Sequence, residues 1–330
     1  MVDPYREIRS ATRAEWLQSR RGGIGSSDAA CLLGASPWGT PLSVWADKAS
    51  TRDPDDDDDD NATKFTNAGK FLEHGIGQYF QHDTGIAVTP ERPFSTYAHL
   101  VHPFMRASPD AWVDLSLAKA REMNLSAVNP QNGKGYIPSG RTILEIKNTA
   151  AWMADEWNDG PPLHIMIQVQ HQMFVLGLSW CFVCVLIGGN TLKWHFVHYD
   201  HKFAEGLLRK CSFFWQANVI ENQEPVASSG MDRETLGKLY SEASSSLRQV
   251  DAQWLEIDGK IQAEAEQIRL LQASVDKNKA KIQQAIGGKE GIILPSGVVW
   301  TNKLQQRKAS VRRVAATSFR VLRRKAARKK

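Results

Sequence analysis

Cysteine and long apolar runs are both scarce in this sequence. The 330 residues include only 4 cysteines, and nothing in their placement suggests disulfides, which suits a reducing compartment. Cys181 and Cys184 have Cys-x-x-Cys spacing, but they lie in an apolar run typical of a buried strand, where residues three apart point to opposite faces. That run, 180–187, is the longest and is too short to cross a bilayer. The N-terminus is polar and charged, without a signal-peptide pattern, so we expect a cytoplasmic protein that does not enter a membrane.

Acidic residues are missing from the end of the chain. Residues 291–330 contain twelve Lys or Arg and no Asp or Glu. Because the whole chain has a formal net charge of +5, the part before this tail is net acidic. A basic tail on an acidic body favours a polyanionic partner, most simply nucleic acid. The alternative is a disordered tail that only improves solubility.

The sequence predicts a mixed α/β domain with a helical extension. We place the α/β domain at 1–222, the extension at 223–290, and a short strand at 292–300 with the basic tail at 291–330. The 55–60 run of aspartates predicts a solvated loop, and the Asn-, Gly- and Pro-rich stretch 116–140 predicts a surface insertion. Patterning predicts helices at 67–84, 161–177 and 202–218, and strands at 94–98, 110–115, 142–147, 180–187 and 192–199.

The extension carries a heptad pattern. Apolar residues recur at alternating three- and four-residue steps from Leu247 to Ala285, and only Glu264 and Asn278 interrupt them. This spacing is typical of a coiled coil or a helical hairpin, because it places one apolar seam along a helix. Gly287 and Gly288 end the pattern.

Two carboxylates and a lysine fall on neighbouring predicted strands. Alternation puts Glu145 and Lys147 on one face of a strand whose Leu144 and Ile146 point to the other. Asp110 begins an adjacent strand. Carboxylate oxygens are the ligands that Mg²⁺ prefers, and an ammonium beside them can contact an attacking water or a phosphate. The alternative is a surface ion pair, but a charge pair inside an apolar strand is expensive unless it is used.

The predicted helix 161–177 carries a polar stripe between apolar ones. At 100° per residue, His164, Gln168, His171 and Gln172 share one side of it. Such a stripe needs buried polar partners, and a metal site or a phosphate would supply them. A solvated stripe is the alternative, and a zinc site on the two histidines lacks evident further ligands.

The segment 20–28 ends in Ser26-Ser27-Asp28 at the start of a short predicted helix. One interpretation is simple N-capping. The other is phosphate capture by Arg20 and Ser27 beside free backbone N–H groups. Four tryptophans are candidates for stacking on bases, although core packing is the default for each. They are Trp38, Trp45, Trp152 and Trp157.

Five short motifs in this order resemble the YqaJ-type viral recombinases, the lambda-exonuclease-like branch of the PD-(D/E)XK nuclease superfamily. The resemblance covers about residues 20–200. The motifs are Gly-Ile-Gly-Ser-Ser-Asp at 23–28 with Ser-Pro-Trp at 36–38, the stretch 69–75 around Glu73, Ser-Pro-Asp at 108–110, Leu-Glu-Ile-Lys at 144–147, and Gln-Val-Gln-His-Gln-Met at 168–173.

The resemblance implies a restriction-endonuclease-like αβββαβ core with a mixed sheet that acts on DNA with Mg²⁺ or Mn²⁺. Asp110 and Glu145 would be metal ligands, helped by the backbone carbonyl of Ile146. Glu73 would act on a second metal or through water. Lys147 would position and activate the nucleophilic water.

Further roles follow from the same resemblance. Gln168 would orient that water or Lys147, and Arg20 and Ser27 would anchor a terminal 5′-phosphate. Members are typically 5′→3′ exonucleases on double-stranded DNA ends, some are ring trimers, and they work with a single-strand annealing protein. The heptad segment leaves another oligomeric state open. The alternatives are a PD-(D/E)XK endonuclease and a non-catalytic DNA-binding or scaffold protein that keeps the fold.

Overall fold

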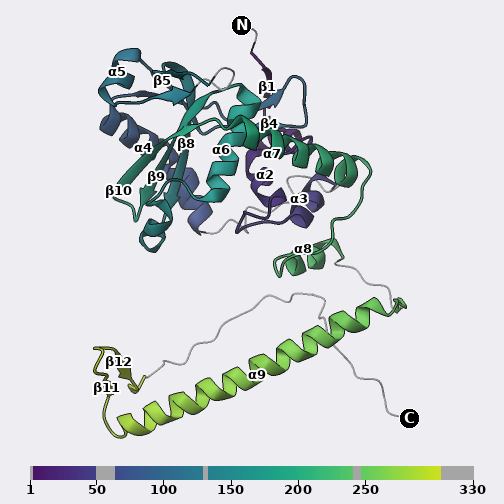
Figure 1. Cartoon of the computed structure of the whole chain (residues 1–330), viewed down its shortest axis with the longest axis vertical. Helices are drawn as coiled ribbons and strands as arrows, with labels where there is room; N and C mark the ends of the chain where they lie inside the picture. Colours follow the sequence, from purple (N-terminus) through teal and green to yellow (C-terminus); the bar gives the residue numbers. More distant parts are fainter. Residues whose placement is uncertain (1–2, 50–63, 129–132, 241–246, 306–330) are drawn as a thin grey trace. The chain divides into compact units, whose positions relative to one another are not determined.

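A computed structural model describes residues 3–49, 64–128, 133–240 and 247–305 (Figure 1). The aspartate run at 55–60 and most of the basic tail lie outside these residues. The chain divides into two units, Met1–Leu239 and Tyr240–Lys330. The short helix α8 (Asp232–Leu239), in the stretch that the sequence assigns to the extension, belongs to the first unit.

The first unit is built around a five-stranded sheet with the order β10-β9-β8-β5-β2. The pair β8 and β9 is parallel, and every other neighbouring pair is antiparallel. The central strand β9 consists of apolar residues and is buried along its whole length. The strands are β2 (Ala87–Pro90), β5 (Ala111–Leu115), β8 (Gly140–Thr149), β9 (Trp180–Ile187) and β10 (Thr191–His198).

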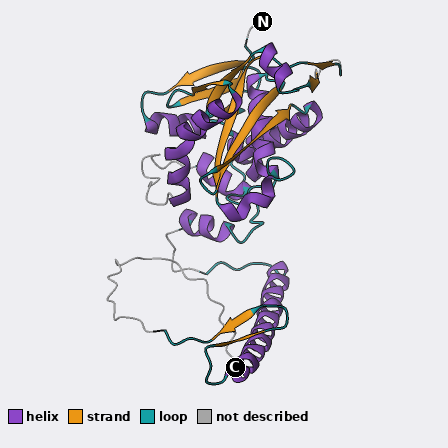
Figure 2. Ribbon diagram, turned by 90° about the vertical axis from the view of Figure 1, so that its left-hand side faces the viewer, coloured by secondary structure: helices purple, strands orange, loops and turns teal. Residues whose placement is uncertain are grey.

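One helix covers each face of this sheet (Figures 1 and 2). Helix α4 (Lys64–Thr84) packs Ile76 and Phe80 on the face that carries Leu144 and Ile146. Helix α6 (Leu163–Leu176) packs on the opposite face, with Ile143 in the same core cluster. In chain order these elements run α4, β2, β5, β8, α6, β9, which confirms the expected αβββαβ core.

Smaller elements surround this core. A three-stranded sheet has the order β1-β3-β4. Helices α2 and α7 share the core cluster of α6, so their apolar side chains close that side of the unit. The bounds are β1 (Tyr5–Arg9), α1 (Arg13–Arg21), α2 (Ser26–Leu32), α3 (Pro41–Lys48), β3 (Ser95–His99), β4 (Arg106–Ala107), the 3-10 helix η3 (Ala151–Trp157), α7 (His201–Phe214) and the π-helix η4 (Trp215–Ile220).

The insertion between β5 and β8 joins two antiparallel neighbours of the sheet, as expected. It contains α5 (Leu117–Glu122) and a small pair formed by β6 (Ala127–Val128) and β7 (Gly135–Tyr136). The strand expected at 94–98 forms as β3, but in the small sheet. The first strand of the αβββαβ core is instead β2, which the sequence did not reveal because it is short, largely exposed and ends at Pro90.

The cysteines behave as core residues. Cys181 packs in the cluster on the α6 side, and Cys184 packs in the cluster on the α4 side. All four cysteines are free thiols. The prediction that Cys181 and Cys184 point to opposite faces of a strand is confirmed.

The second unit holds one long helix and a small hairpin. Helix α9 (Gln253–Ile286) begins after Leu247 and Val250, so these two positions of the heptad pattern lie outside it. The expected single strand at 292–300 is wrong: the segment folds as β11 (Gly291–Ile293) and β12 (Val299–Thr301), because Gly297 with φ +83° turns the chain between them. Within the described residues, no helix combines the length and apolarity needed to cross a bilayer.

Candidate active site

Glu145 is the centre of a buried polar cluster. Its side chain is fully buried at 0% exposure on β8. Lys147 Nζ and Gln168 Nε2 both donate to Glu145 Oε1, the latter at 2.5 Å. Gln172 Nε2 donates to Glu145 Oε2 at 2.8 Å. Both oxygens of the buried carboxylate therefore accept hydrogen bonds from charged or amide donors, which offsets much of its desolvation.

The cluster follows from two periodicities. Strand alternation turns Glu145 and Lys147 toward α6, while the helical repeat brings Gln168 and Gln172 to the same side of that helix. The prediction that the polar stripe of this helix meets buried partners is confirmed. Gln172, which the sequence placed in the stripe without a role, is a direct partner of Glu145.

Asp110 lies beside this cluster, immediately before β5. Its Oδ2 accepts a hydrogen bond from the backbone N–H of Ile146 at 2.8 Å. Burial and the negative charge of Glu145 raise the pKa of Asp110 well above its usual value, although Lys147 acts in the opposite direction. Two carboxylates this close oppose each other's ionisation, so a cation between them would be favoured.

Glu73 reaches the same region from the other side of the sheet. It comes from α4 and lines a cavity of about 240 Å³ together with Asp110 and Ile146. Burial and the charge of Glu145 raise the pKa of Glu73. Glu73 does not complete a tight cluster, however, because no three His, Cys, Asp or Glu side chains of the described residues are placed to hold a metal ion together.

Lys147 forms the cationic side of the site, with His164 in its vicinity. Burial disfavours the ammonium, but Glu145 and Asp110 outweigh it and raise the pKa of Lys147 to about 12. Lys147 therefore stays charged at neutral pH. Burial and the positive charge of Lys147 lower the pKa of His164, which lies in the first turn of α6.

The donor set fits a hard divalent cation such as Mg²⁺. Asp110 and Glu145 offer carboxylate oxygens, and their mutual repulsion is the charge that a cation would neutralise. Gln172 Oε1 is buried without a hydrogen-bond partner, so the site also has an unsatisfied acceptor. Mg²⁺ is commonly held by one or two carboxylates and keeps several waters, so a three-carboxylate cage is not required.

The segment that carries Arg20 and Ser27 is tied to α6. Ser26 Oγ lies 3.2 Å from Nδ1 of His171, which is fully buried and directly precedes Gln172. Ser27 is exposed at the start of α2. The guanidinium of Arg20 lies 4.8 Å above the ring of Trp16.

Asp28 stiffens the same segment. Its Oδ2 accepts from the Gly25 backbone N–H at 2.8 Å and pairs with Lys48 Nζ at 2.8 Å. Burial opposes ionisation, but Lys48 and Arg20 outweigh it and lower the pKa of Asp28. No sequence motif indicated Lys48, which comes from α3 and has only 3% of its side chain exposed.

The four candidate tryptophans separate into two kinds. Trp157 is 4% exposed and Trp45 packs against the same core cluster. Trp38 is 85% exposed and Trp152 is 76% exposed. Trp152 belongs to η3, which begins two residues after β8 ends.

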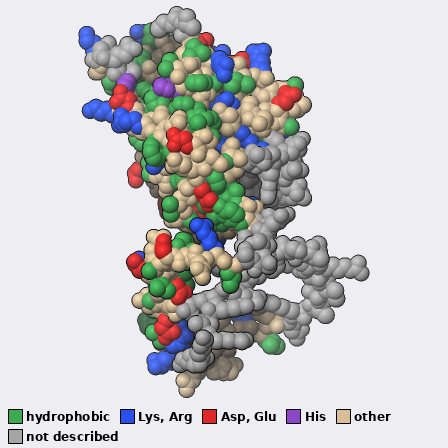
Figure 3. Space-filling view, turned by 90° about the vertical axis from the view of Figure 1, so that its right-hand side faces the viewer, with side chains coloured by type: hydrophobic (Ala, Val, Ile, Leu, Met, Phe, Trp, Pro, Cys, Tyr) green, Lys and Arg blue, Asp and Glu red, His purple; other side chains and the backbone are tan. Residues whose placement is uncertain are grey.

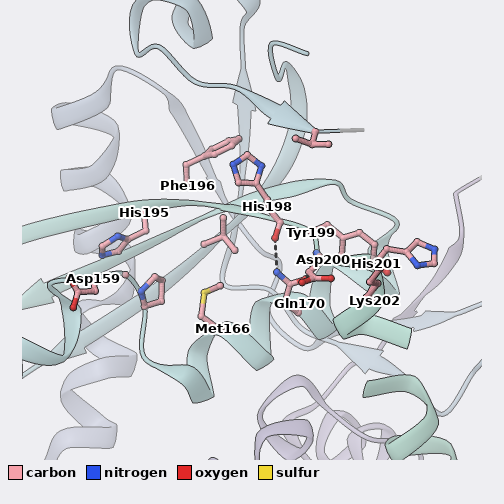
Figure 4. A pocket seen from close by; sticks show the side chains of 14 residues that line it. Asp159, Met166, Gln170, His195, Phe196, His198, Tyr199, Asp200, His201 and Lys202 are labelled. Atoms are coloured by element: carbon pink, nitrogen blue, oxygen red, sulfur yellow. Dashed lines mark hydrogen bonds between the residues drawn. The ribbon is translucent and has the colours of Figure 1, made fainter. Parts of the chain in front are cut away.

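A larger hollow of about 750 Å³ lies elsewhere in the unit, along β10 (Figure 4). Gln170 braces its floor by donating to the His198 carbonyl at 2.6 Å and accepting from the Asp200 N–H at 2.8 Å. None of Asp110, Glu145 and Lys147 lines it. Volume alone therefore does not select the candidate site, and the charged cluster around Glu145 is the better candidate.

Comparisons with known proteins agree with the sequence motifs. The family model described as a YqaJ-like viral recombinase domain matches residues 15–179. The protein YqaJ of Bacillus subtilis (strain 168) is 30% identical over 239 residues, which is 71% of this chain. The chain spans 66% of the length of that relative.

Solved structures with similarity include nucleases. An alkaline exonuclease, LHK-Exo, from Laribacter hongkongensis is 16% identical with a TM-score of 0.47, over 68% of this chain and 98% of that one. A phage-related exonuclease from Haemophilus somnus 129PT is 10% identical with a TM-score of 0.32, over 49% of this chain and 74% of that one.

Proposed function

Because the chain belongs to the YqaJ-like viral recombinase family, we propose that it is a metal-dependent nuclease that hydrolyses phosphodiester bonds at the ends of duplex DNA during phage-type recombination. The observation that carries the proposal is the buried carboxylate of Glu145. It lies beside Asp110 and is held by Lys147, Gln168 and Gln172.

Asp110, Glu145 and the backbone carbonyl of Ile146 would hold Mg²⁺ or Mn²⁺, with Glu73 acting on a second ion or through water. The bound ion would supply positive charge to the phosphate and lower the pKa of a water. The raised pKa values of Asp110 and Glu73 support this assignment, because burial and the negative charge of Glu145 both push these carboxyl groups toward neutrality.

Lys147 positions the attacking water and stabilises negative charge on the phosphate. Its ammonium is charged at neutral pH, so it donates hydrogen bonds and does not act as a base in that state. Gln168 and Gln172 fix the rotamer of Glu145 through its two oxygens. His164, in the first turn of α6, adds a neutral ring in the vicinity of Lys147.

Arg20 and Ser27 would anchor a terminal 5′-phosphate, which gives a 5′→3′ direction. Ser27 is exposed, and the adjacent Ser26 ties its segment to the helix that carries the two glutamines. The duplex DNA end is then the substrate, and a single-strand annealing protein is the expected partner. The tail beyond residue 305 offers further positive charge for the DNA backbone.

A time course on three DNA forms tests this function. Linear, nicked and covalently closed circular duplexes are incubated with the full chain, once with Mg²⁺ and once with a chelator. We expect loss of the linear form only, and only with Mg²⁺. Cleavage of the closed circle would indicate an endonuclease, and binding without cleavage of any form would indicate a non-catalytic protein.

The Lys147→Ala variant links the activity to the site. It should keep the circular dichroism spectrum of the unmodified chain and bind linear duplex, yet leave that DNA intact with Mg²⁺. Digestion at the unmodified rate would remove Lys147, and the cluster around it, from the proposed mechanism.

A further inference from the structure

Helix α9 exposes an apolar stripe along its length, which only Glu264 and Asn278 interrupt. The six large apolar side chains of its seam between residues 254 and 275 are between 45% and 68% exposed, although amphipathic helices in proteins gain most of their stability from packing of the apolar face. Figure 3 shows hydrophobic side chains beside acidic and basic ones at the surface of the second unit, which contains α9. The seam residues are Trp254, Ile257, Ile261, Ile268, Leu271 and Val275.

Among the described residues of the second unit, no other element matches the length of this stripe. Its other described elements are the short strands β11 and β12, which lie at the C-terminal end where Ile286 is buried. A 34-residue helix extends over about 50 Å, so the seam needs a second helix of similar length. The seven-residue spacing of the seam is the pattern that pairs helices in coiled coils.

Charge along α9 is divided between its halves. Residues 253–266 contain four acidic side chains and one lysine, so this half has a net charge of −3. Residues 267–286 contain four basic side chains and one aspartate, so the other half has a net charge of +3. A second copy of the same helix is complementary to this pattern only when it runs in the opposite direction.

We propose that α9 pairs with α9 of a second copy of this chain as an antiparallel two-stranded coiled coil. The acidic half of each copy then meets the basic half of the other. The two helix dipoles run in opposite directions, which is also favourable. The inference is independent of the proposed nuclease activity, because it uses no residue of the first unit.

Full overlap of the two helices also aligns the seam. The bounds of α9 place its centre between residues 269 and 270. About that centre, Ile268 faces Leu271 of the partner, Ile257 faces Ile282, and the large Trp254 faces the small Ala285. On the flanks, where the paired positions are shifted by two residues from this register, Asp258 comes near Lys279 and Lys260 comes near Lys281. The seam positions of one copy therefore meet those of the other without any shift.

The parallel arrangement is less favourable. It brings Glu264 against the same glutamate of the partner in the seam, where like charges are desolvated. It also sets the acidic halves side by side and the basic halves side by side. In the antiparallel pair, Glu264 of each copy faces Val275 of the other. Neither of these two contacts therefore brings like charges together in the seam.

Sedimentation of the full chain at two salt concentrations tests the pairing. We expect a dimer whose dissociation constant rises roughly tenfold between 50 and 500 mM NaCl, because salt screens the attraction between opposite halves. A parallel coiled coil would tighten with salt, since its halves repel. A monomer at micromolar concentration, or a tightening dimer, would overturn the proposal.

Charge reversal provides a matched comparison. The triple variant Lys277→Glu, Lys279→Glu, Lys281→Glu makes both halves acidic and should dissociate into monomers. Reversing three exposed cations on α7 changes the net charge equally and should leave the dimer intact; these are Lys202→Glu, Arg209→Glu and Lys210→Glu. Equal behaviour of the two triple variants would contradict a role for the charged halves of α9.

Disulfide trapping reads the direction of the helices. In a Cys31→Ser background, one copy carries Ile257→Cys and a differently tagged copy carries Ile282→Cys. Under mild oxidation the mixture should yield the disulfide-linked pair of unlike copies, and neither variant alone should link to itself. Self-linking of either variant alone would establish the parallel arrangement and exclude the proposed one.

Discussion

Gln172 on α6 donates a hydrogen bond to Glu145 on β8 at 2.8 Å, although 27 residues separate them in the chain. The contact joins the helix on one face of the sheet to the carboxylate at its centre. Both side chains are fully buried, so neither can exchange this partner for water. The position of Glu145 therefore depends on α6 as much as on its own strand.

Replacing Gln172 tests that dependence. Gln172→Leu introduces an apolar side chain of similar size and removes one hydrogen-bond donor from Glu145. We expect nuclease activity to fall about 10- to 100-fold, as is typical when a partner of a metal-ligating residue is lost. The measurement is the initial rate on linear duplex with Mg²⁺, below the melting temperature of the variant.

Gln170 supplies the control for that variant. It lies on the same helix, but it bonds the backbone of His198 and Asp200 and makes no contact with Glu145. Gln170→Leu should lower thermal stability while the rate per folded molecule stays close to that of the unmodified chain. Equal loss of rate in both variants would assign the effect to the helix and not to the carboxylate.

The exposed fractions of Trp152 and Trp157 predict different effects of their replacement on stability. Trp157→Ala should cost about 3–5 kcal/mol of folding free energy, because it empties a buried core position. Trp152→Ala should change stability by less than about 0.5 kcal/mol, as substitutions at exposed positions usually do.

If Trp152 stacks on a base, its loss weakens single-strand binding by about 1–3 kcal/mol. Urea denaturation and fluorescence anisotropy separate these outcomes, and unchanged affinity would rule out stacking.

Ser27 and Ser26 distinguish phosphate capture from packing. Ser27→Ala should slow degradation of 5′-phosphorylated ends more than that of 5′-hydroxyl ends, because an exposed hydroxyl is lost at the proposed anchor. Ser26→Ala loses the contact with His171 instead and should slow both substrates alike. The ratio of the two rates is the readout, and a ratio unchanged by Ser27→Ala would contradict 5′-phosphate capture.

His171 predicts a pH dependence of stability. Burial lowers its pKa from 6.5 to about 4 in the folded chain. Between these values the unfolded chain binds the proton and the folded chain does not, so stability falls as pH drops through this window. The loss reaches about 3 kcal/mol at most.

The His171→Gln variant isolates this contribution. It cannot take up a proton, whereas the other titrating groups are shared with the unmodified chain. Urea denaturation of both proteins at pH 7 and pH 4.5 gives the difference. The unmodified chain should lose more stability than the variant, and identical losses would mean that His171 is not buried in its neutral form.

Much of the core could be read from periodicity alone. Alternation in 142–147 and the helical stripe of 161–177 are local patterns, and the structure places Glu145, Gln168 and Gln172 together as those patterns require. The sheet edge was harder. Strand β2 is four residues long, largely exposed and ends in proline, so it has neither an apolar run nor a clean alternation.

Contacts between distant segments carried no local signal. Lys48 has the sequence context of an ordinary surface residue, yet α3 turns it into the buried partner of Asp28. Glu73 was singled out by its motif, but its placement on the α4 side of the sheet follows from packing of the whole helix. The heptad pattern indicated a coiled coil or hairpin without fixing where the helix begins, because Leu247 and Val250 fit the spacing and still precede it.

The contact between Ser26 and His171 has a consequence for product size. Ser27 is the next residue, and His171 is followed by Gln172, so two hydrogen bonds between neighbouring segments link the proposed phosphate anchor to Glu145. A DNA terminus bound at Ser27 would thus lie at the same distance from Glu145 in every turnover. Uniform fragments would then be released from first cut to last, whatever the base composition of the strand.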